Sequence, residues 1–249
     1  MSTPQLPLGL RYAPDQRLEN YRDAPAGLLL LLESIARGER NDALFLSGAG
    51  SAGKTHLLLG MCAEATAQRS TRGGLAQTAP SPAGREEDRD VAYLPLRMFG
   101  ARSVDALSGQ DAAALICIDD VDAIAGMRDA EIALFDLHNR LRAAGGAIVY
   151  AAKAMPAQLA LDLPDLRSRL AQCTQFTLEI PDEPARRAIL RQRAQTRGLE
   201  LDDAVLDWLF RRVDRDLGTL TALLDRLDRA SLAAQRRITV PFLRQTLDL

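Results

Sequence analysis

The chain has 249 residues, of which 47% are hydrophobic and 26% charged, as in an ordinary globular protein with a buried core. Its 31 basic and 33 acidic residues give a net charge of −2, which excludes an overall positive field for tight binding to nucleic acid. The longest apolar run is too short for a membrane span, the N-terminus has no signal-peptide pattern, and the few cysteines and histidines lack zinc-site spacing, so we expect a cytoplasmic protein.

Helices and strands are expected to alternate over the first 180 residues. A proline-containing extended tail (1–14) precedes a helix over 27–37, a strand over 42–47 and a helix over 54–68. Residues 69–90 are rich in Gly, Pro, Ser and charge and predict a flexible surface insertion. Further strands are expected at 91–96, 114–120 and 146–152, with 175–178 as a candidate fifth. This order predicts an α/β fold whose parallel sheet carries helices on both faces.

The pattern becomes entirely helical after Ile180. Asp182 is expected to cap a helix that ends at Gly198, and further helices are expected over 202–213, from 216, and after Thr239. We therefore predict an α/β nucleotide-binding domain over 15–180, followed by a small all-helical domain over 181–249.

A phosphate-binding loop follows the first predicted strand. The segment FLSGAGSAGKTHLLLG contains G-x-x-x-x-G-K-[ST] between a strand and a helix, which is the context that this pattern requires. Glycines let backbone N–H groups curl around phosphates, the lysine neutralises the terminal phosphates, and the hydroxyl of Thr55 is a magnesium ligand. We therefore expect bound ADP or ATP with Mg²⁺. The residues expected to contact the nucleotide here are Gly48, Ala49, Gly50, Ser51, Ala52, Gly53, Lys54, Thr55 and His56.

Two aspartates end the apolar strand ALICIDD. Carboxylates at this edge of a parallel sheet face the crevice in which ligands bind. We assign Asp119 to the magnesium ion, together with Thr55, and Asp120 to the orientation of an attacking water. The alternative is that both aspartates only cap the following helix.

Two arginines are candidates for contacts with phosphates. Arg169, in LPDLRSRLAQC, follows the fourth strand and could reach the phosphates of a neighbouring molecule, as arginine fingers do. Arg215 opens a helix of the C-terminal domain and could fold back onto the protein's own nucleotide. Arg167, Arg211 and Arg212 are local competitors for these roles.

These motifs together resemble the AAA+ ATPase family in its bacterial initiator branch, and within it the regulators homologous to the initiator DnaA. The resemblance rests on GAGSAGKTHLL, CIDDVDAIAG, FDLHNRL, LPDLRSRL, the opening QLPLGL and the C-terminal DRDLGTLTALLDRLDRASLAAQRRITVPFL. It covers nearly the whole chain except 69–90. The initiator would continue into a helix-turn-helix DNA-binding domain, for which this chain leaves no residues.

The resemblance implies a negative regulator of chromosomal replication initiation. Such proteins bind ADP, attach to the sliding clamp on DNA, which is the β subunit of DNA polymerase III, and promote hydrolysis of the ATP held by DnaA. They reach DNA only through the clamp. By position, Arg169 becomes the arginine finger inserted in trans, and Arg215 the lid arginine that contacts the nucleotide in cis. Whether the protein also forms homo-oligomers stays open.

The N-terminal tail resembles a clamp-binding peptide. In such peptides a glutamine hydrogen-bonds in a groove of the clamp and spaced leucines fill an apolar pocket, roles that fall to Gln5, Leu6 and Leu8. Pro7 inside the motif and Gly9 after it depart from the usual pattern.

A second departure concerns hydrolysis at the protein's own site. After the fourth strand the family usually places a polar residue that senses the terminal phosphate, whereas this chain has Ala151, Ala152 and Lys153. A lysine cannot accept the hydrogen bond that positions a water. We therefore expect weak intrinsic hydrolysis and a nucleotide that serves as a switch. The alternatives are a helicase or clamp-loader ATPase that hydrolyses its own ATP, and an accessory factor of transposition or restriction.

Overall fold

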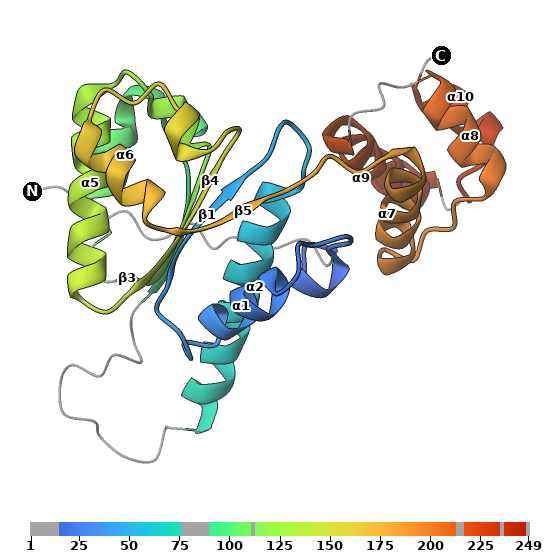
Figure 1. Ribbon diagram of the computed structural model, residues 1–249. Coiled ribbons are helices and arrows are strands. Elements are labelled where there is room, and N and C mark those ends of the chain that lie inside the picture. The colour runs from blue at the N-terminus through green and yellow to red at the C-terminus, as the bar shows by residue number, and fades with distance from the viewer. Residues whose placement is uncertain (1–14, 76–89, 111–112, 213–216, 235–236, 248–249) are drawn as a thin grey trace, which may run out of the picture.

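The computed structural model describes residues 15–75, 90–110, 113–212, 217–234 and 237–247. They form an α/β core and a smaller all-helical domain (Figure 1). The core contains η1 (Leu18–Asn20), α1 (Leu28–Ala36), β1 (Ala43–Ser47), α2 (Lys54–Leu75), β2 (Asp90–Pro95), α3 (Leu96–Phe99), η3 (Gly100–Arg102), α4 (Ser103–Ser108), β3 (Ala113–Asp119), η4 (Val121–Ile124), α5 (Arg128–Ala143), β4 (Ala147–Ala152), η5 (Pro156–Gln158), α6 (Pro164–Ala171) and β5 (Thr174–Thr177). The helical domain contains α7 (Glu183–Thr196), α8 (Asp203–Arg212), α9 (Leu217–Ala234) and α10 (Val240–Leu247).

The five strands form one parallel sheet in the order β2-β3-β4-β1-β5. Strand β1 lies between β4 and β5, with Leu44 opposite Val149 on one side and Thr174 on the other. Strands β3 and β4 are almost entirely buried, which accounts for their unbroken apolar sequences. The predicted parallel α/β sheet, followed in the chain by a helical domain, is thus confirmed.

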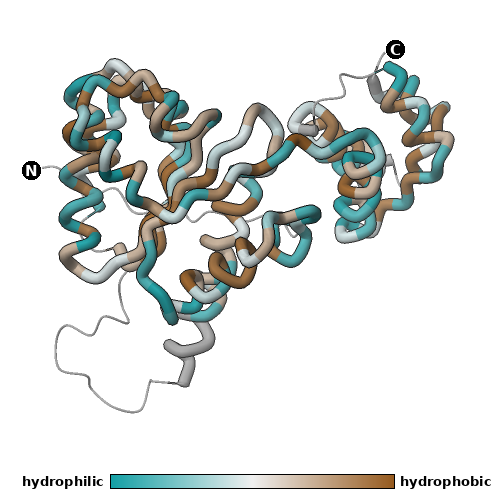
Figure 2. The backbone as a smooth tube through the Cα atoms, viewed as in Figure 1, coloured by the Kyte–Doolittle hydropathy of each residue, from teal (hydrophilic) through white to brown (hydrophobic). Residues whose placement is uncertain are grey.

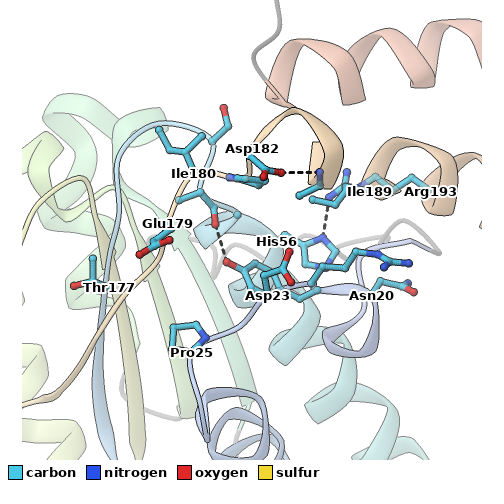
Figure 3. Close-up of a pocket in the computed structure, with 17 residues that line it drawn as sticks. Asn20, Asp23, Pro25, His56, Thr177, Glu179, Ile180, Asp182, Ile189 and Arg193 are labelled. Atoms are coloured by element: carbon cyan, nitrogen blue, oxygen red, sulfur yellow. Dashed lines mark hydrogen bonds between the residues drawn. The ribbon is translucent and has the colours of Figure 1, made fainter. Parts of the chain in front are cut away.

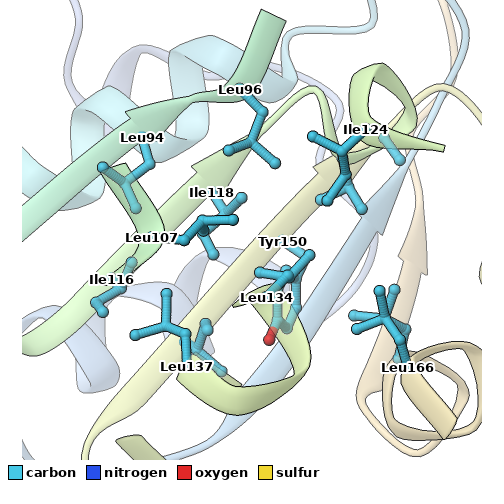
Figure 4. Packing of buried hydrophobic residues seen from close by; sticks show 14 of the residues in the cluster. Leu94, Leu96, Leu107, Ile116, Ile118, Ile124, Leu134, Leu137, Tyr150 and Leu166 are labelled. Carbon is cyan, nitrogen blue, oxygen red and sulfur yellow. The ribbon is translucent and has the colours of Figure 1, made fainter. Parts of the chain in front are cut away.

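Separate helices cover the two faces of this sheet (Figures 1 and 4). On one face, Leu134 and Leu137 of α5 and Leu166 of α6 pack against Ile118 and the other inward residues of the strands. The opposite face carries α1 and α2, whose buried leucines form a second cluster with alternate residues of the strands. Helix α2, which begins at the phosphate-binding loop, and helix α6, which carries Arg169, therefore lie on opposite faces.

The helical domain has its own apolar core. Leu190, Trp208, Phe210, Leu224 and Leu243 come from four different helices and pack together. Figure 2 shows the same arrangement as brown residues that alternate with teal ones along these helices. An amphipathic stripe on each helix thus accounts for the folding of this domain.

Helix α7 begins as the sequence predicts. The carboxylate of Asp182 accepts a hydrogen bond from the backbone N–H of Ala185 at 2.9 Å, which is the capping contact. The helix ends at Thr196, and Gly198 follows in the left-handed conformation with φ 73°.

Helix α2 differs from the prediction. It runs to Leu75, past the predicted end at residue 68 and into the stretch that was expected to be flexible. No proline occurs between Lys54 and Pro80, so no residue of this stretch lacks the N–H that a helical hydrogen bond needs, and the glycines at 73 and 74 only weaken the helix. The rest of the predicted insertion (76–89), the N-terminal tail with Gln5, Leu6 and Leu8, and Arg215 lie outside the described residues.

Candidate functional site

The loop between β1 and α2 has the backbone shape of a phosphate cradle. Gly50 and Gly53 have φ angles of 36° and 87°, a region that other residues rarely adopt. A Cβ atom at Gly48 would lie 2.7 Å from the carbonyl oxygen of Leu178, so the close approach of the loop to the chain after β5 also requires glycine. The three glycines therefore permit the curled backbone that phosphates need.

Lys54 lies inside this loop. It is almost fully buried, and its ammonium donates hydrogen bonds to the carbonyl oxygens of Gly48 and of Gly50, the latter at 3.3 Å. Burial lowers the pKa of Lys54, whereas Asp119 and the other nearby carboxylates act in the opposite direction. A buried ammonium at the start of α2 is suited to neutralise the terminal phosphates of a nucleotide.

Thr55 and Asp119 are in direct contact. The Thr55 hydroxyl donates to Oδ2 of Asp119 at 2.6 Å, and the Tyr93 hydroxyl donates to the same oxygen at 3.0 Å. Burial raises the pKa of Asp119, and its hydrogen bond with Thr55 opposes that shift. A hydroxyl and a carboxylate beside a phosphate loop form a hard oxygen donor set that fits Mg²⁺. Tyr93, which orients this carboxylate from β2, was not identified from the sequence.

Asp120 has a different environment. Its backbone is left-handed, with φ 54°, and its carboxylate lies 3.2 Å from the Nε of Arg97, which also contacts Asp122 at 3.0 Å. A carboxylate whose oxygens already accept from a guanidinium has fewer lone pairs free to accept a hydrogen bond from a water. The structure thus places Asp120 beside the metal-type pair but engages it with Arg97, a residue that the sequence did not single out.

The end of β4 carries no polar side chain. Ala151 and Ala152 are buried, and Lys153 follows them. The backbone N–H of Lys153 donates to Asp122 at 3.1 Å, and its ammonium lies 3.8 Å from the same carboxylate. Lys153 thus faces Asp122, and none of these three side chains is an acceptor for the hydrogen bond of a water.

A pocket of about 650 Å³ continues from the phosphate loop toward the helical domain (Figure 3). Its walls come from the segment around η1, from the loop itself and from α7. Tyr21 closes one side, because its hydroxyl donates to the carbonyl oxygen of Ala52 at 2.8 Å and its ring lies against Gly53. The pocket can hold the base and sugar of a nucleotide whose phosphates lie in the loop.

His56 joins α2 to the helical domain at this pocket. Its Nδ1 accepts from the guanidinium of Arg193 at 2.9 Å, so its Nε2 carries the proton and donates to the carbonyl oxygen of Arg17 at 2.9 Å. Arg193 also lies 3.4 Å from the buried carboxylate of Asp15, which pairs with Arg197 at 2.9 Å. His56 is therefore a neutral bridge between three segments that are distant in the sequence.

This bridge predicts a dependence of stability on pH. Burial, assisted by Arg193, lowers the pKa of His56 to about 4, against roughly 6.5 in an unfolded chain. The unfolded chain therefore takes up the proton first as the pH falls. The contribution of His56 to the free energy of unfolding is complete above pH ~6.5 and is lost progressively toward pH ~4, by up to about 3 kcal/mol.

Urea unfolding measured between pH 7 and pH 4 checks this expectation. The variant His56→Gln can keep both hydrogen bonds but does not titrate, so its stability should fall less over this range. His138, whose pKa is also lowered to about 4 by burial, stays in both proteins and cancels from the comparison. Identical profiles for the two proteins would contradict the assignment.

Of the two candidate arginines, only Arg169 lies among the described residues, and Arg215 does not. Arg169 lies in the last turn of α6, is exposed, and makes no side-chain hydrogen bond or ion pair within the described ranges. Arg167 is half-buried on the same helix, and Arg212 lies over the ring of Trp208 at 5.3 Å. Helix α6, which carries Arg169, covers the face of the sheet opposite to α2, the helix that begins at the phosphate loop.

Comparisons with known proteins agree with this architecture. Residues 182–247 match the family model described as Hda, lid domain. Domain III of the Thermotoga maritima replication initiation protein DnaA is similar over 96% of this chain and 98% of that chain, with 23% identity and a TM-score of 0.70. DnaA of Aquifex aeolicus bound to AMPPCP is similar over 89% and 67%, with 20% identity and a TM-score of 0.63. The Thermotoga maritima RuvB Holliday junction branch migration motor is similar over 89% and 66%, with 18% identity and a TM-score of 0.53.

These similarities show the fold of the AAA+ proteins, with a helical lid domain at its C-terminal side. Residues 182–247 match the Hda lid family, and the chain as a whole shares the fold of DnaA domain III. No helix among the described residues is both long and apolar enough to cross a membrane.

Proposed function

We propose that this protein is a nucleotide-bound negative regulator of chromosomal replication initiation, which acts in the cytoplasm on the initiator DnaA. The observation that carries the proposal is the combination of an Hda-type lid with a DnaA-type core that holds a complete phosphate loop. A regulator that shares the fold of its target can join the target's assembly by the same surfaces.

The bound nucleotide, ADP or ATP, serves as a switch in this proposal. Lys54 and the loop amides bind its phosphates, while Thr55 and Asp119 hold Mg²⁺, which supplies charge neutralisation at the phosphate oxygens. Hydrolysis at this site is slow, because Asp120 is paired with Arg97 and the end of β4 offers no acceptor for a water. The pocket between core and lid then links the nucleotide to the position of the lid, and Arg215 is the proposed lid contact.

The activity lies in Arg169. Its exposed guanidinium is available to a neighbouring molecule, and a guanidinium placed at the terminal phosphate stabilises the charge that develops during transfer. In the proposed complex Arg169 inserts in trans at the ATP held by DnaA. The sliding clamp, bound through the N-terminal tail, brings the regulator to DNA, so the chain itself needs no DNA-binding surface.

The tail gives a direct prediction about the clamp. Replacing Gln5, Leu6 and Leu8 with alanine removes the amide and the two apolar side chains that a clamp groove would bind. We expect clamp binding to be lost in a direct titration, while the melting temperature and the bound nucleotide stay unchanged. Unaltered affinity for the clamp would remove the tail from the proposal.

The proposal as a whole is tested by a pull-down with purified DnaA and clamp loaded on DNA, followed by identification of the bound nucleotide by mass. We expect both proteins to be retained and an adenine nucleotide to be present in a ratio near one per chain. Retention of neither DnaA nor the clamp would contradict the proposed function.

A further inference from the structure

We infer that Glu131 is the residue that positions Arg169, through the backbone at the start of α6. The inference rests on the proposed function of Arg169, but the contacts that support it are independent of that function. Glu131 lies in the first turn of α5 and has no exposed surface. A carboxylate is among the groups least often buried completely, so its place here calls for an explanation.

All hydrogen bonds of the Glu131 carboxylate go to backbone N–H groups of two loops. Oε1 accepts from Gly126 at 2.8 Å and from Asp162 at 3.1 Å, and Oε2 accepts from Leu163 at 2.7 Å. Leu163 is the residue that immediately precedes α6. Its apolar side chain has no atom that could cap the helix. Glu131 therefore fixes the entry of α6 from a neighbouring helix, in a place where the helix lacks a cap of its own.

The rest of α6 is held by apolar packing. The helix has eight residues and begins with Pro164, and Leu166 and Leu170 anchor its inner side in the apolar cluster. Apolar packing without directional bonds allows small rotations and shifts, whereas the two hydrogen bonds from Asp162 and Leu163 to Glu131 hold the start of the helix in one place. A displacement of about 1 Å at a finger costs on the order of a hundredfold in rate, so the fixed entry of α6 matters for where the guanidinium of Arg169 lies.

The test uses Glu131→Gln, which keeps the shape of the side chain and one acceptor oxygen but presents an amide N–H₂ to one of the donors. Backbone hydrogen exchange is measured at Asp162, Leu163 and along α6. We expect faster exchange at these amides than in the wild-type protein. Unchanged exchange would overturn the inference, whatever the fate of the proposed function.

The second measurement is the stimulation of DnaA hydrolysis at saturating regulator. We expect Glu131→Gln to lower the stimulated rate about tenfold or more, and to have no further effect in the background of Arg169→Ala, because both changes act on the same group. Ile35→Val and Ile35→Ala, on the opposite face of the sheet, are controls for a general loss of stability and should keep full stimulation.

The possible results distinguish a failure of the positioning role of Glu131 from a failure of the proposed function of Arg169. Faster exchange with full stimulation would overturn the positioning role, as would an additive loss in the double variant. Undiminished stimulation by Arg169→Ala alone would instead contradict the proposed function and, with it, the statement that Glu131 aims a finger.

Discussion

ATP bound to DnaA should persist when Arg169→Ala replaces the wild-type protein in a reaction with clamp-loaded DNA. The exposed guanidinium of Arg169 is the group that we propose for the terminal phosphate of that ATP. Arginine fingers contribute on the order of a thousandfold or more to the rate of phosphoryl transfer. The loss of stimulation should therefore be nearly complete, as measured by the conversion of DnaA-bound ATP to ADP under single-turnover conditions.

Two controls make this result specific. The variant should keep its melting temperature, its own nucleotide and its affinity for the clamp, because Arg169 makes no side-chain hydrogen bond or ion pair in the described part of the chain. Arg167→Ala, two residues earlier on α6, should have a much weaker effect. A stronger effect at Arg167 would transfer the finger to that residue, and full activity of both variants would exclude α6 from the mechanism.

The second large effect is expected at the protein's own nucleotide. Lys54→Ala removes the buried ammonium that lies within the curled loop, so retention of adenine nucleotide should be abolished. The amount of nucleotide that remains after gel filtration, identified by mass, measures this directly.

The chain provides a matched control, because its only other lysine is Lys153. That ammonium is exposed and lies beside Asp122, so Lys153→Ala should keep the nucleotide. Equal retention by wild type and Lys54→Ala would mean that the nucleotide does not bind in this loop.

The sequence predicted the architecture well because local patterns determine it. The strand around Ile118 is apolar on both faces, as is typical of a central strand in a sheet covered on both sides. The glycines, lysine and threonine around Lys54 have the spacing of a phosphate-binding loop. The end of α2 was predicted too early, since glycines lower helix propensity without stopping a helix. Boundaries of this kind depend on small energies that the pattern does not resolve.

The contacts across the site could not be predicted in the same way. Tyr93 and Arg97 reach the two aspartates from another strand and its following helix, and Arg193 reaches His56 from the lid. Each pair joins residues that are distant in the sequence. Nothing in the sequence around each tyrosine or arginine distinguishes it from the other tyrosines and arginines of the chain. Only the fold shows that His56, expected as a nucleotide contact, also serves as the bridge to the lid.

The central claim is that the protein promotes hydrolysis of its partner's ATP rather than its own. The most direct measurement uses ATP labelled at the terminal phosphate, loaded first on DnaA alone and, in a second reaction, on this protein alone, with the clamp on DNA present in both. We expect rapid release of labelled phosphate when the label starts on DnaA, and slow release when it starts on this protein. Rapid release from this protein, with no change in the rate at DnaA, would contradict the account and favour a motor.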